Sequence, residues 1–207
     1  MPPQSKTPKP SSVAAVVLAA GASTRMGGPK ALLHWRGTSL VRHAVACYDG
    51  AGCRPIVVVV AEPFGHDVAA EVASLPSVVV VSNPDPARGM LSSLQLGVAA
   101  ALAAGADAVC FSPVDVPLAG PETVQAVLAA ELGGGDVAIA GYEGQPGHPV
   151  RVTAAAARAL LAAPATSSAR DVLGAFRSAL LETPDAGVVG NLNTPQDLER
   201  WHERRRS

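Results

Sequence analysis

Aromatic residues and net charge are both scarce in this chain of 207 residues. Phe, Trp and Tyr together make up 3% of the sequence, and the formal net charge at pH 7 is -1. A protein that binds single-stranded nucleic acid needs aromatic side chains on which bases stack and a basic groove for the phosphates. We therefore expect no nucleic-acid partner, and any anion site must be built locally.

The chain also lacks paired cysteines and long apolar runs. Cys47, Cys53 and Cys110 are scattered and do not have the CxxC spacing of a zinc or redox site, so we expect buried thiols. No stretch reaches the roughly 20 consecutive apolar residues of a membrane span, and residues 1–12 contain Pro, Ser and Lys instead of an apolar leader. We therefore expect a cytoplasmic protein without a membrane partner.

Short apolar runs separated by helical patterns dominate the rest of the sequence. Runs rich in Val and Ala are typical of strands that are buried on both faces of a parallel sheet. These strands are expected at residues 13–19, 56–61, 78–81 and 108–111. Helices are expected between and after them, at residues 39–48, 65–75, 90–104 and 121–132. This alternation predicts an α/β fold with a doubly wound, mostly parallel sheet.

The alternation of expected strands and helices changes after Gly133, Gly134 and Gly135. Two short strands at 137–140 and 148–152, separated by a Gly- and Pro-rich loop, predict a short antiparallel insertion. Helices are then expected at 154–162 and 169–180, and Pro195 opens a final charged helix. Prolines at positions 2, 3, 8 and 10 predict a disordered lead over residues 1–12, which leaves residues 13–207 as one domain.

The loop after the first apolar run contains glycines and two cations, Arg25 and Lys30. Glycines let backbone N–H groups approach phosphate oxygens, and the cations can neutralise charge on a leaving pyrophosphate. The loop has neither the GxxxxGK[ST] nor the GxGxxG pattern, which disfavours a P-loop hydrolase and a dinucleotide dehydrogenase. The alternative is a tight turn with solvated cations.

Four segments carry a resemblance to a known family. Their residues, in chain order, are Leu18-Ala19-Ala20-Gly21 with Ser23, Arg25-Met26-Gly27 and Pro29-Lys30; Asn83-Pro84-Asp85 with Gly89-Met90 and Ser92-Ser93-Leu94; Pro113-Val114-Asp115-Val116-Pro117; and Asn191-Leu192-Asn193-Thr194-Pro195. Together they closely resemble the MobA-like NTP transferases, and within them the molybdenum cofactor cytidylyltransferases. The resemblance covers residues 13–201 in the family's order.

Membership would imply a Rossmann-like, three-layer α/β/α fold and a Mg²⁺- or Mn²⁺-dependent nucleotidyltransferase. An acceptor phosphate would attack the α-phosphate of a nucleoside triphosphate, and pyrophosphate would leave. The resemblance implies catalytic roles for Arg25, Lys30 and Asp115. It implies nucleotide contacts from Leu18, Ala19, Ala20, Gly21, Ser23, Arg25, Lys30, Asn83, Gly89, Met90, Ser92 and Ser93.

The implied metal ligands are Asp115 and Asn193. A carboxylate and an amide oxygen are both hard ligands that suit Mg²⁺, although the amide carries no charge. Each residue has a structural alternative. Asp115 could be a turn or capping residue, and Asn193 could cap the helix that Pro195 opens.

The acceptor side matches the family least well. The resemblance of Gly147-His148-Pro149-Val150 implies an acceptor contact from His148, and Arg170 and Asp171 occupy the place of a further acceptor segment. The expected acceptor is molybdopterin, with a molybdoenzyme apoprotein as a possible partner. A sugar phosphate, methylerythritol phosphate or a non-catalytic cofactor-binding role are the alternatives.

The nucleobase is predicted from two conflicting segments. The closing Asn-Leu-Asn-Thr-Pro segment resembles guanylyl-type enzymes, whereas the first loop resembles cytidylyl-type ones. Ala20 stands where guanylyl-type enzymes usually have Gly, and its methyl group should crowd a purine more than a pyrimidine. CTP is therefore favoured over GTP.

Overall fold

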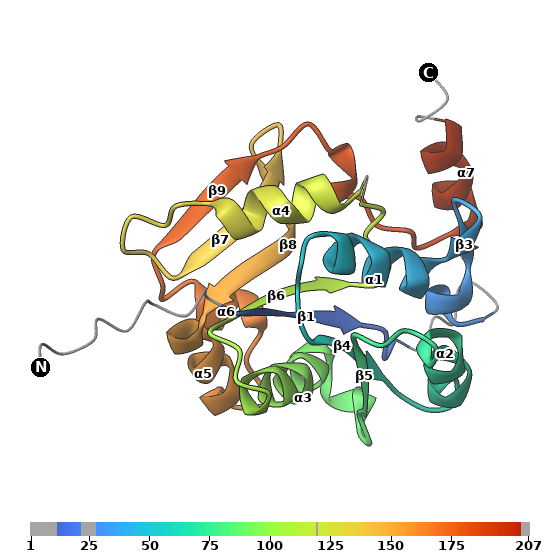
Figure 1. Cartoon of the computed structure of the whole chain (residues 1–207), viewed down its shortest axis with the longest axis horizontal. Coiled ribbons are helices and arrows are strands. Elements are labelled where there is room, and N and C mark those ends of the chain that lie inside the picture. The colour runs from blue at the N-terminus through green and yellow to red at the C-terminus, as the bar shows by residue number, and fades with distance from the viewer. Residues whose placement is uncertain (1–11, 22–27, 119, 204–207) are drawn as a thin grey trace, which may run out of the picture.

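The computed structural model describes residues 12–21, 28–118 and 120–203. Seven strands form one sheet in the order β5-β4-β1-β6-β8-β7-β9 (Figure 1). The strands are β1 (Val13–Leu18), β4 (Ile56–Val60), β5 (Val78–Ser82), β6 (Ala108–Pro113), β7 (Val137–Tyr142), β8 (Gln145–Thr153) and β9 (Ser178–Glu182). Only β8 runs against its neighbours, so the sheet is mostly parallel.

Helices cover both faces of this sheet. They are α1 (Leu40–Gly50), α2 (Gly65–Val72), α3 (Met90–Ala103), α4 (Pro121–Ala129), α5 (Ala154–Ala162), α6 (Ala169–Leu173) and α7 (Pro195–Glu203). Side chains of β1 alternate between two cores: Ala15 and Val17 face the core that includes α1, α2 and α4, whereas Val16 faces the core that includes α3 and α5. The predicted three-layer α/β/α fold is confirmed.

The strand order places a topological switch point beside β1. From β1 the chain continues outward through β4 to β5, and then crosses back to add β6 on the opposite side of β1. Helix α1, which follows β1, and helix α3, which leads into β6, therefore cover opposite faces of the sheet. In open α/β sheets, ligands bind in the crevice beyond the carboxyl ends of such strands.

The segment predicted as one helix over 169–180 is instead a short helix followed by a strand. Helix α6 ends at Leu173 with Gly174 as its C-cap, and β9 then pairs in parallel with β7. In β9, exposed residues alternate with half-buried ones, as in a strand at the edge of a sheet. The helix prediction was wrong at 174–180 because Ala175, Phe176, Ala179 and Leu180 have helical spacing, whereas the pairing of β9 with β7 decides the structure of the segment.

The predicted antiparallel insertion is present and is longer than expected. Strands β7 and β8 pair with each other, and β8 also pairs with β6, so the insertion extends the main sheet. A two-stranded hairpin that was not predicted joins β2 (His34–Trp35) and β3 (Thr38–Ser39).

Three further sequence predictions can be compared with the structure. All three cysteines are buried and none forms a disulfide, as predicted, and burial raises the pKa of the Cys53 thiol to about 12. No helix among the described residues is long and apolar enough to cross a membrane. The division of the chain at residue 12 stays a prediction, because residues 1–11 lie outside the described part.

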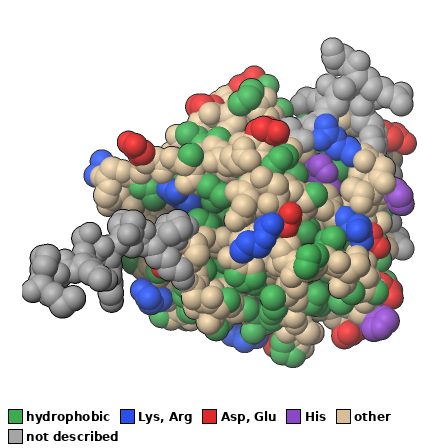
Figure 2. All heavy atoms as spheres, viewed as in Figure 1, with side chains coloured by type: hydrophobic (Ala, Val, Ile, Leu, Met, Phe, Trp, Pro, Cys, Tyr) green, Lys and Arg blue, Asp and Glu red, His purple; other side chains and the backbone are tan. Residues whose placement is uncertain are grey.

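The surface carries charges of both signs. On the face that Figure 2 shows, Lys and Arg side chains are interspersed with Asp and Glu side chains across the described residues. The local arrangement of charges must therefore decide where an anion binds.

Candidate functional site

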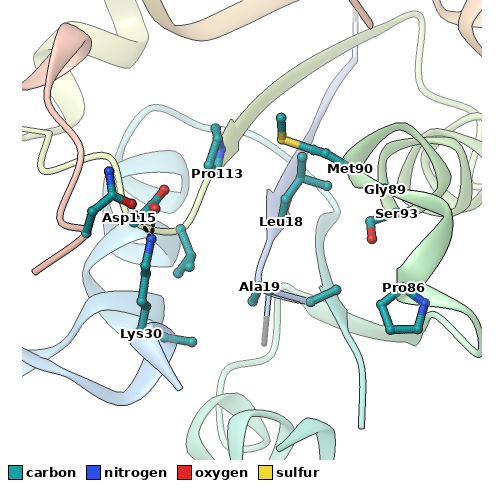
Figure 3. Close-up of a pocket in the computed structure, with 14 residues that line it drawn as sticks. Leu18, Ala19, Lys30, Pro86, Gly89, Met90, Ser93, Pro113 and Asp115 are labelled. Atoms are coloured by element: carbon teal, nitrogen blue, oxygen red, sulfur yellow. Dashed lines mark hydrogen bonds and ion pairs between the residues drawn. The ribbon is translucent and has the colours of Figure 1, made fainter. Parts of the chain in front are cut away.

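A cavity of about 360 Å³ opens at the carboxyl ends of β1 and β6, at the switch point of the sheet (Figure 3). Its walls come from four parts of the chain that were singled out in the sequence. The lining residues are Leu18, Ala19, Ala20, Gly21, Lys30, Ala31, Pro86, Gly89, Met90, Ser93, Pro113, Val114, Asp115 and Asn193.

One end of the cavity is charged. The Lys30 ammonium donates to Asp115 Oδ2 at 2.6 Å and to Asn193 Oδ1 at 2.5 Å. Lys30 and Asp115 are 85 residues apart and Lys30 and Asn193 are 163 apart, so only the fold brings them together. The Lys30 and Asp115 side chains are 19% and 15% exposed, and an ion pair that is partly withdrawn from water interacts more strongly than one on the surface.

Asn193 directs its side chain into this cluster rather than capping a helix. Helix α7 is capped by Thr194, whose Oγ1 accepts from the Asp197 N–H at 3.2 Å. In return, Asp197 Oδ2 accepts from the backbone N–H groups of Thr194 and Asn193 at 2.8 and 3.0 Å. This reciprocal pair is a capping box, and it leaves the Asn193 amide oxygen for the Lys30 ammonium.

The described residues at the opposite end of the cavity are uncharged, and a buried polar network supports them. Ser93 lines the cavity there, together with Pro86, Gly89 and Met90 (Figure 3). Behind it lies Asn83, which is 3% exposed and donates to both the Ser92 and Ser93 hydroxyls. Asn83 and Ser92 do not line the cavity, so their expected nucleotide contacts stay predictions.

Comparison with known proteins identifies the family. The MobA-like NTP transferase domain matches residues 15–181. The chain belongs to the MobA-like NTP transferase family. It is a nucleotidyltransferase with a Rossmann-like α/β fold.

Relatives of this transferase use different nucleotides. The molybdenum cofactor guanylyltransferase of Cereibacter sphaeroides is 32% identical over 206 residues, which cover 89% of this chain and 93% of that protein. The molybdenum cofactor cytidylyltransferase of Escherichia coli is 26% identical over 199 residues, which cover 94% of this chain and 97% of that protein. Both proteins are named for the molybdenum cofactor, but one name gives a guanylyl group and the other a cytidylyl group as the group transferred.

A solved structure has the same fold. The crystal structure of Rv0371c from Mycobacterium tuberculosis H37Rv in complex with manganese superposes with a TM-score of 0.69 at 22% identity. The superposition covers 93% of the present chain and 99% of the mycobacterial one. At this identity the likeness establishes the fold alone.

The charged end of the transferase's cavity has ligands that suit a divalent cation. Asp115 and Asn193 already place one carboxylate oxygen and one amide oxygen around a single positive group, the Lys30 ammonium. The described residues contain no cluster of three or more His, Cys, Asp and Glu side chains that could hold a metal alone. A site with two protein oxygens fits Mg²⁺ or Mn²⁺, because such sites complete their coordination with phosphate oxygens and water.

His148 of the transferase is uncharged at neutral pH. It lies on β8, its ring centroid is 6.2 Å from that of Phe111, and burial lowers its pKa to about 4. Among the described residues its Nδ1 atom has no hydrogen-bond partner. His148 does not line the cavity, so its expected acceptor contact stays a prediction, and such a contact would involve a neutral imidazole.

The two other predicted acceptor residues lie on α6, and neither lines the cavity. Arg170 and Asp171 are both exposed. Asp171 forms a capping box with Ser168, and hydrogen bonds from Ser168 lower the pKa of its carboxyl group. Their proposed contact with the acceptor stays a prediction, whereas the capping role of Asp171 is visible in the structure.

Two predicted residues cannot be placed, and four lining residues were missed. Ser23 and Arg25 lie outside the described residues. The missed residues are Ala31, Pro86, Pro113 and Val114. Each is adjacent to a predicted residue or lies inside a segment that resembles the family. Their position in these segments could have predicted them, whereas the chemistry of their side chains could not.

Proposed function

We propose that this nucleotidyltransferase transfers CMP from CTP to a phosphorylated acceptor, with molybdopterin as the preferred acceptor and pyrophosphate as the second product. The observation that carries the proposal is a single cavity with the Lys30, Asp115 and Asn193 cluster at one end and the uncharged Ser93 wall at the other. A nucleoside triphosphate has the same polarity, with anionic phosphates at one end and a neutral base at the other.

The reaction requires no nucleophilic side chain. An oxygen of the acceptor phosphate forms a bond to the α-phosphorus, and the bond from that phosphorus to the bridging oxygen of the β-phosphate breaks. The leaving pyrophosphate keeps the electron pair of the broken bond. Lys30 is placed to neutralise the charge that builds on the phosphates, and stabilisation of this kind is usually the largest contribution of a protein to such a step.

Asp115 and Asn193 would hold the divalent cation, Mg²⁺ or Mn²⁺. The cation supplies positive charge at the phosphate oxygens and fixes their orientation. The protein's own contribution is to keep both oxygen ligands on one side of the cavity, where Asp115 follows β6 and Asn193 precedes α7. The manganese in the mycobacterial structure supports a metal in this fold.

CTP is proposed over GTP because of the wall formed by the first loop. Ala20 lines the cavity, and its methyl group takes space that a glycine would leave to a purine. The Asn-Leu-Asn-Thr-Pro segment, which resembles guanylyl-type enzymes, contributes Asn193 at the charged end, where it would not contact the base. Molybdopterin is preferred because both relatives described above are named for the molybdenum cofactor.

The test is a screen of acceptors against nucleotides. The purified full chain is incubated with each of CTP, GTP, ATP and UTP, with Mg²⁺ or Mn²⁺, and with molybdopterin, a sugar phosphate or methylerythritol phosphate. Pyrophosphate release is measured, and we expect the highest rate with CTP and molybdopterin.

Two outcomes would contradict the proposal in different ways. Pyrophosphate release with only a sugar phosphate or methylerythritol phosphate would replace the acceptor. Tight molybdopterin binding without pyrophosphate from any triphosphate would instead favour a non-catalytic cofactor-binding protein, because a passive binder has no need to stabilise a leaving group.

A further inference from the structure

Strand β5 forms one edge of the main sheet. It pairs with β4 on its inner side and is the last strand in the sheet order, so no strand of the described residues covers its outer side. In Figure 1 it lies at the rim of the molecule, between α2 and α3. Val79 and Val80 on this strand are 45% and 38% exposed, and they are adjacent in the sequence. Together they give the edge an apolar surface on both faces of the sheet.

The backbone of β5 presents hydrogen-bonding groups on its outer side. The segment bonds to β4 through the Ser77 carbonyl and the Asn83 N–H. The direction of the backbone groups alternates along a strand, so Val78, Val80 and Ser82 face away from β4. Unpaired N–H and C=O groups on an edge strand are a template on which a further strand can pair.

Strand β5 also lacks the features that usually protect an edge. Its sequence is Val-Val-Val-Val-Ser, without charge or proline. The strand at the opposite edge, β9, ends in the exposed Glu182 and follows the exposed Arg177. Charged residues and prolines on an edge strand hinder pairing with another chain. The β5 edge is therefore better suited than the β9 edge to receive a further strand.

A second copy of β5 fits this edge. A two-fold axis at Val80 aligns the whole strand with its own copy in an antiparallel pair. Val80 then exchanges both backbone hydrogen bonds with Val80 of the second copy, and the Ser82 N–H donates to the Val78 carbonyl of the second copy. The two Val80 side chains lie side by side on one face of the joined sheet, and Val79 packs beside Val81 of the second copy on the other.

Charges at the two ends of β5 are complementary in this arrangement. A cavity of about 540 Å³ lies next to the segment that leads into β5, and its lining includes Leu75, Arg42 and Arg54. Arg54 is paired with Asp49 at 3.0 Å, whereas Arg42 donates to a backbone carbonyl of α2, which carries no net charge. The exposed Asp85 follows the other end of β5. The two-fold axis places Asp85 of the second copy opposite Leu75, at the edge of this basic cavity.

We propose that the protein forms a two-fold dimer in which the β5 strands of two copies pair in antiparallel, with Val80 on the axis and Asp85 of each copy beside Arg42 of the other. A second copy supplies both the uncharged strand and the carboxylate. An interface built around one short strand is small, so the dimer should dissociate with a Kd on the order of 10 μM. Each contact occurs twice, so one substitution perturbs both ends of the interface.

Sedimentation velocity of the full chain, at concentrations below and above about 10 μM, tests the proposal. The wild type should change from monomer to dimer over this range. Val80→Pro removes the outward N–H at a position where an edge strand tolerates proline, and should raise the Kd of the dimer at least about tenfold. Val80→Thr is the control at the same position, because it keeps the N–H and the β-branched shape, so its Kd should stay near that of the wild type.

The matched control at the other edge of the sheet is Leu180→Pro. Thr183 on the chain after β9 donates to the Gly141 carbonyl on β7, so the Leu180 N–H faces away from β7. This variant should dimerise as the wild type does. A wild type that stays monomeric at every concentration would overturn the proposal. So would a dimer that Leu180→Pro weakens and Val80→Pro does not, because that dimer would form through β9.

A charge exchange tests the contact between Asp85 and Arg42. Asp85→Arg and Arg42→Glu should each raise the Kd by about tenfold, because like charges then meet at both ends of the interface. The double variant restores opposite charges and should return the Kd close to that of the wild type. Losses that add in the double variant would overturn the proposed arrangement.

A cross-link keeps the test decisive if Val80→Pro does not fold. The Cα atoms of directly opposed residues in a hydrogen-bonded antiparallel pair are about 5.5 Å apart, which a disulfide can span. Val80→Cys should therefore form a covalent dimer when oxidised glutathione is supplied as the oxidant. Val79→Cys is the control, because the two copies of residue 79 are diagonal neighbours, about 7–8 Å apart. The native cysteines are buried, so the wild type serves as the blank. A cross-link in Val79→Cys but not in Val80→Cys would overturn the proposal.

Discussion

Gly97 on α3 should stabilise the fold although it lies inside a helix. A Cβ atom at this position would overlap Val16 Cγ1 on β1 and lie 3.0 Å from Val59 Cγ2 on β4. Both valines are fully buried, so neither can move into solvent. The missing side chain lets α3 approach the sheet closely, and Gly97 lies one turn beyond Ser93, so this packing also positions one wall of the cavity.

The expected effect of Gly97→Ala is a balance of two terms. Alanine favours a helix over glycine by about 1 kcal/mol, whereas overpacking a rigid core costs about 1–3 kcal/mol. Because the overlap is with a side chain on the central strand, we expect the packing term to win by about 1–2 kcal/mol. For a domain of this size that lowers the Tm by about 2–8 °C. The KM for the nucleotide should rise as α3 shifts.

Thermal and urea unfolding measure the stability, and initial rates measure the KM. The control is Ala99→Gly at an exposed position of the same helix, which should lose about 1 kcal/mol from helix propensity alone. Adding Val16→Ala should relieve the overlap. The double variant should therefore lose about 1 kcal/mol less unfolding free energy than the sum of the losses in the two single variants. A Gly97→Ala protein more stable than wild type would refute the close approach.

The remaining predictions concern the charged end of the cavity and His148. Asp115→Ala should lower turnover by at least about a hundredfold, the scale of losing one electrostatic stabiliser. The control is Asp67→Ala at an exposed position of α2, which should keep the turnover of the wild type. Normal Mg²⁺-dependent turnover in Asp115→Ala would exclude the metal role. Asn193→Asp should lower the Mg²⁺ concentration needed for half-maximal activity and leave the Tm unchanged, because Thr194 caps α7; an unchanged metal dependence would argue against Asn193 as a ligand. His148 has a folded-state pKa of about 4, below its ordinary value, so the unfolded chain takes up the proton first and stability should fall as the pH drops from about 6.5 towards 4. Urea unfolding should show a loss of at most about 3 kcal/mol over that range that is absent in His148→Gln, and identical pH profiles would contradict the burial of a neutral imidazole.

The parallel part of the fold was predictable because its strands are buried on both faces. A short continuous apolar run such as Ile56–Val60 is typical of a strand that is buried on both faces of a sheet. The helices between such runs make the strands parallel. The edge of the sheet was harder. Residues 174–180 were mistaken for helix because the apolar residues there are spaced as on one face of a helix, and only the pairing of β9 with β7 decides the structure.

The charged end of the site was predictable from position in the chain. Lys30 and Asp115 follow neighbouring strands, and the carboxyl ends of neighbouring parallel strands meet at one edge of the sheet. The roles of Asn83 and Ser93 were not separable in the same way. Both occur in one segment that resembles the family, and only the structure places one in the cavity wall and the other behind it, because hydrogen-bond direction is not encoded in spacing.

A competition between nucleotides in one reaction tests the proposed preference for CTP most directly. The full chain is given equal concentrations of CTP and GTP, Mg²⁺ and molybdopterin, and the two dinucleotide products are quantified by mass spectrometry. Discrimination by close packing and hydrogen bonds should give at least about ten cytosine products for each guanine product. Equal amounts, or an excess of the guanine product, would contradict the assignment of CTP and the role of Ala20.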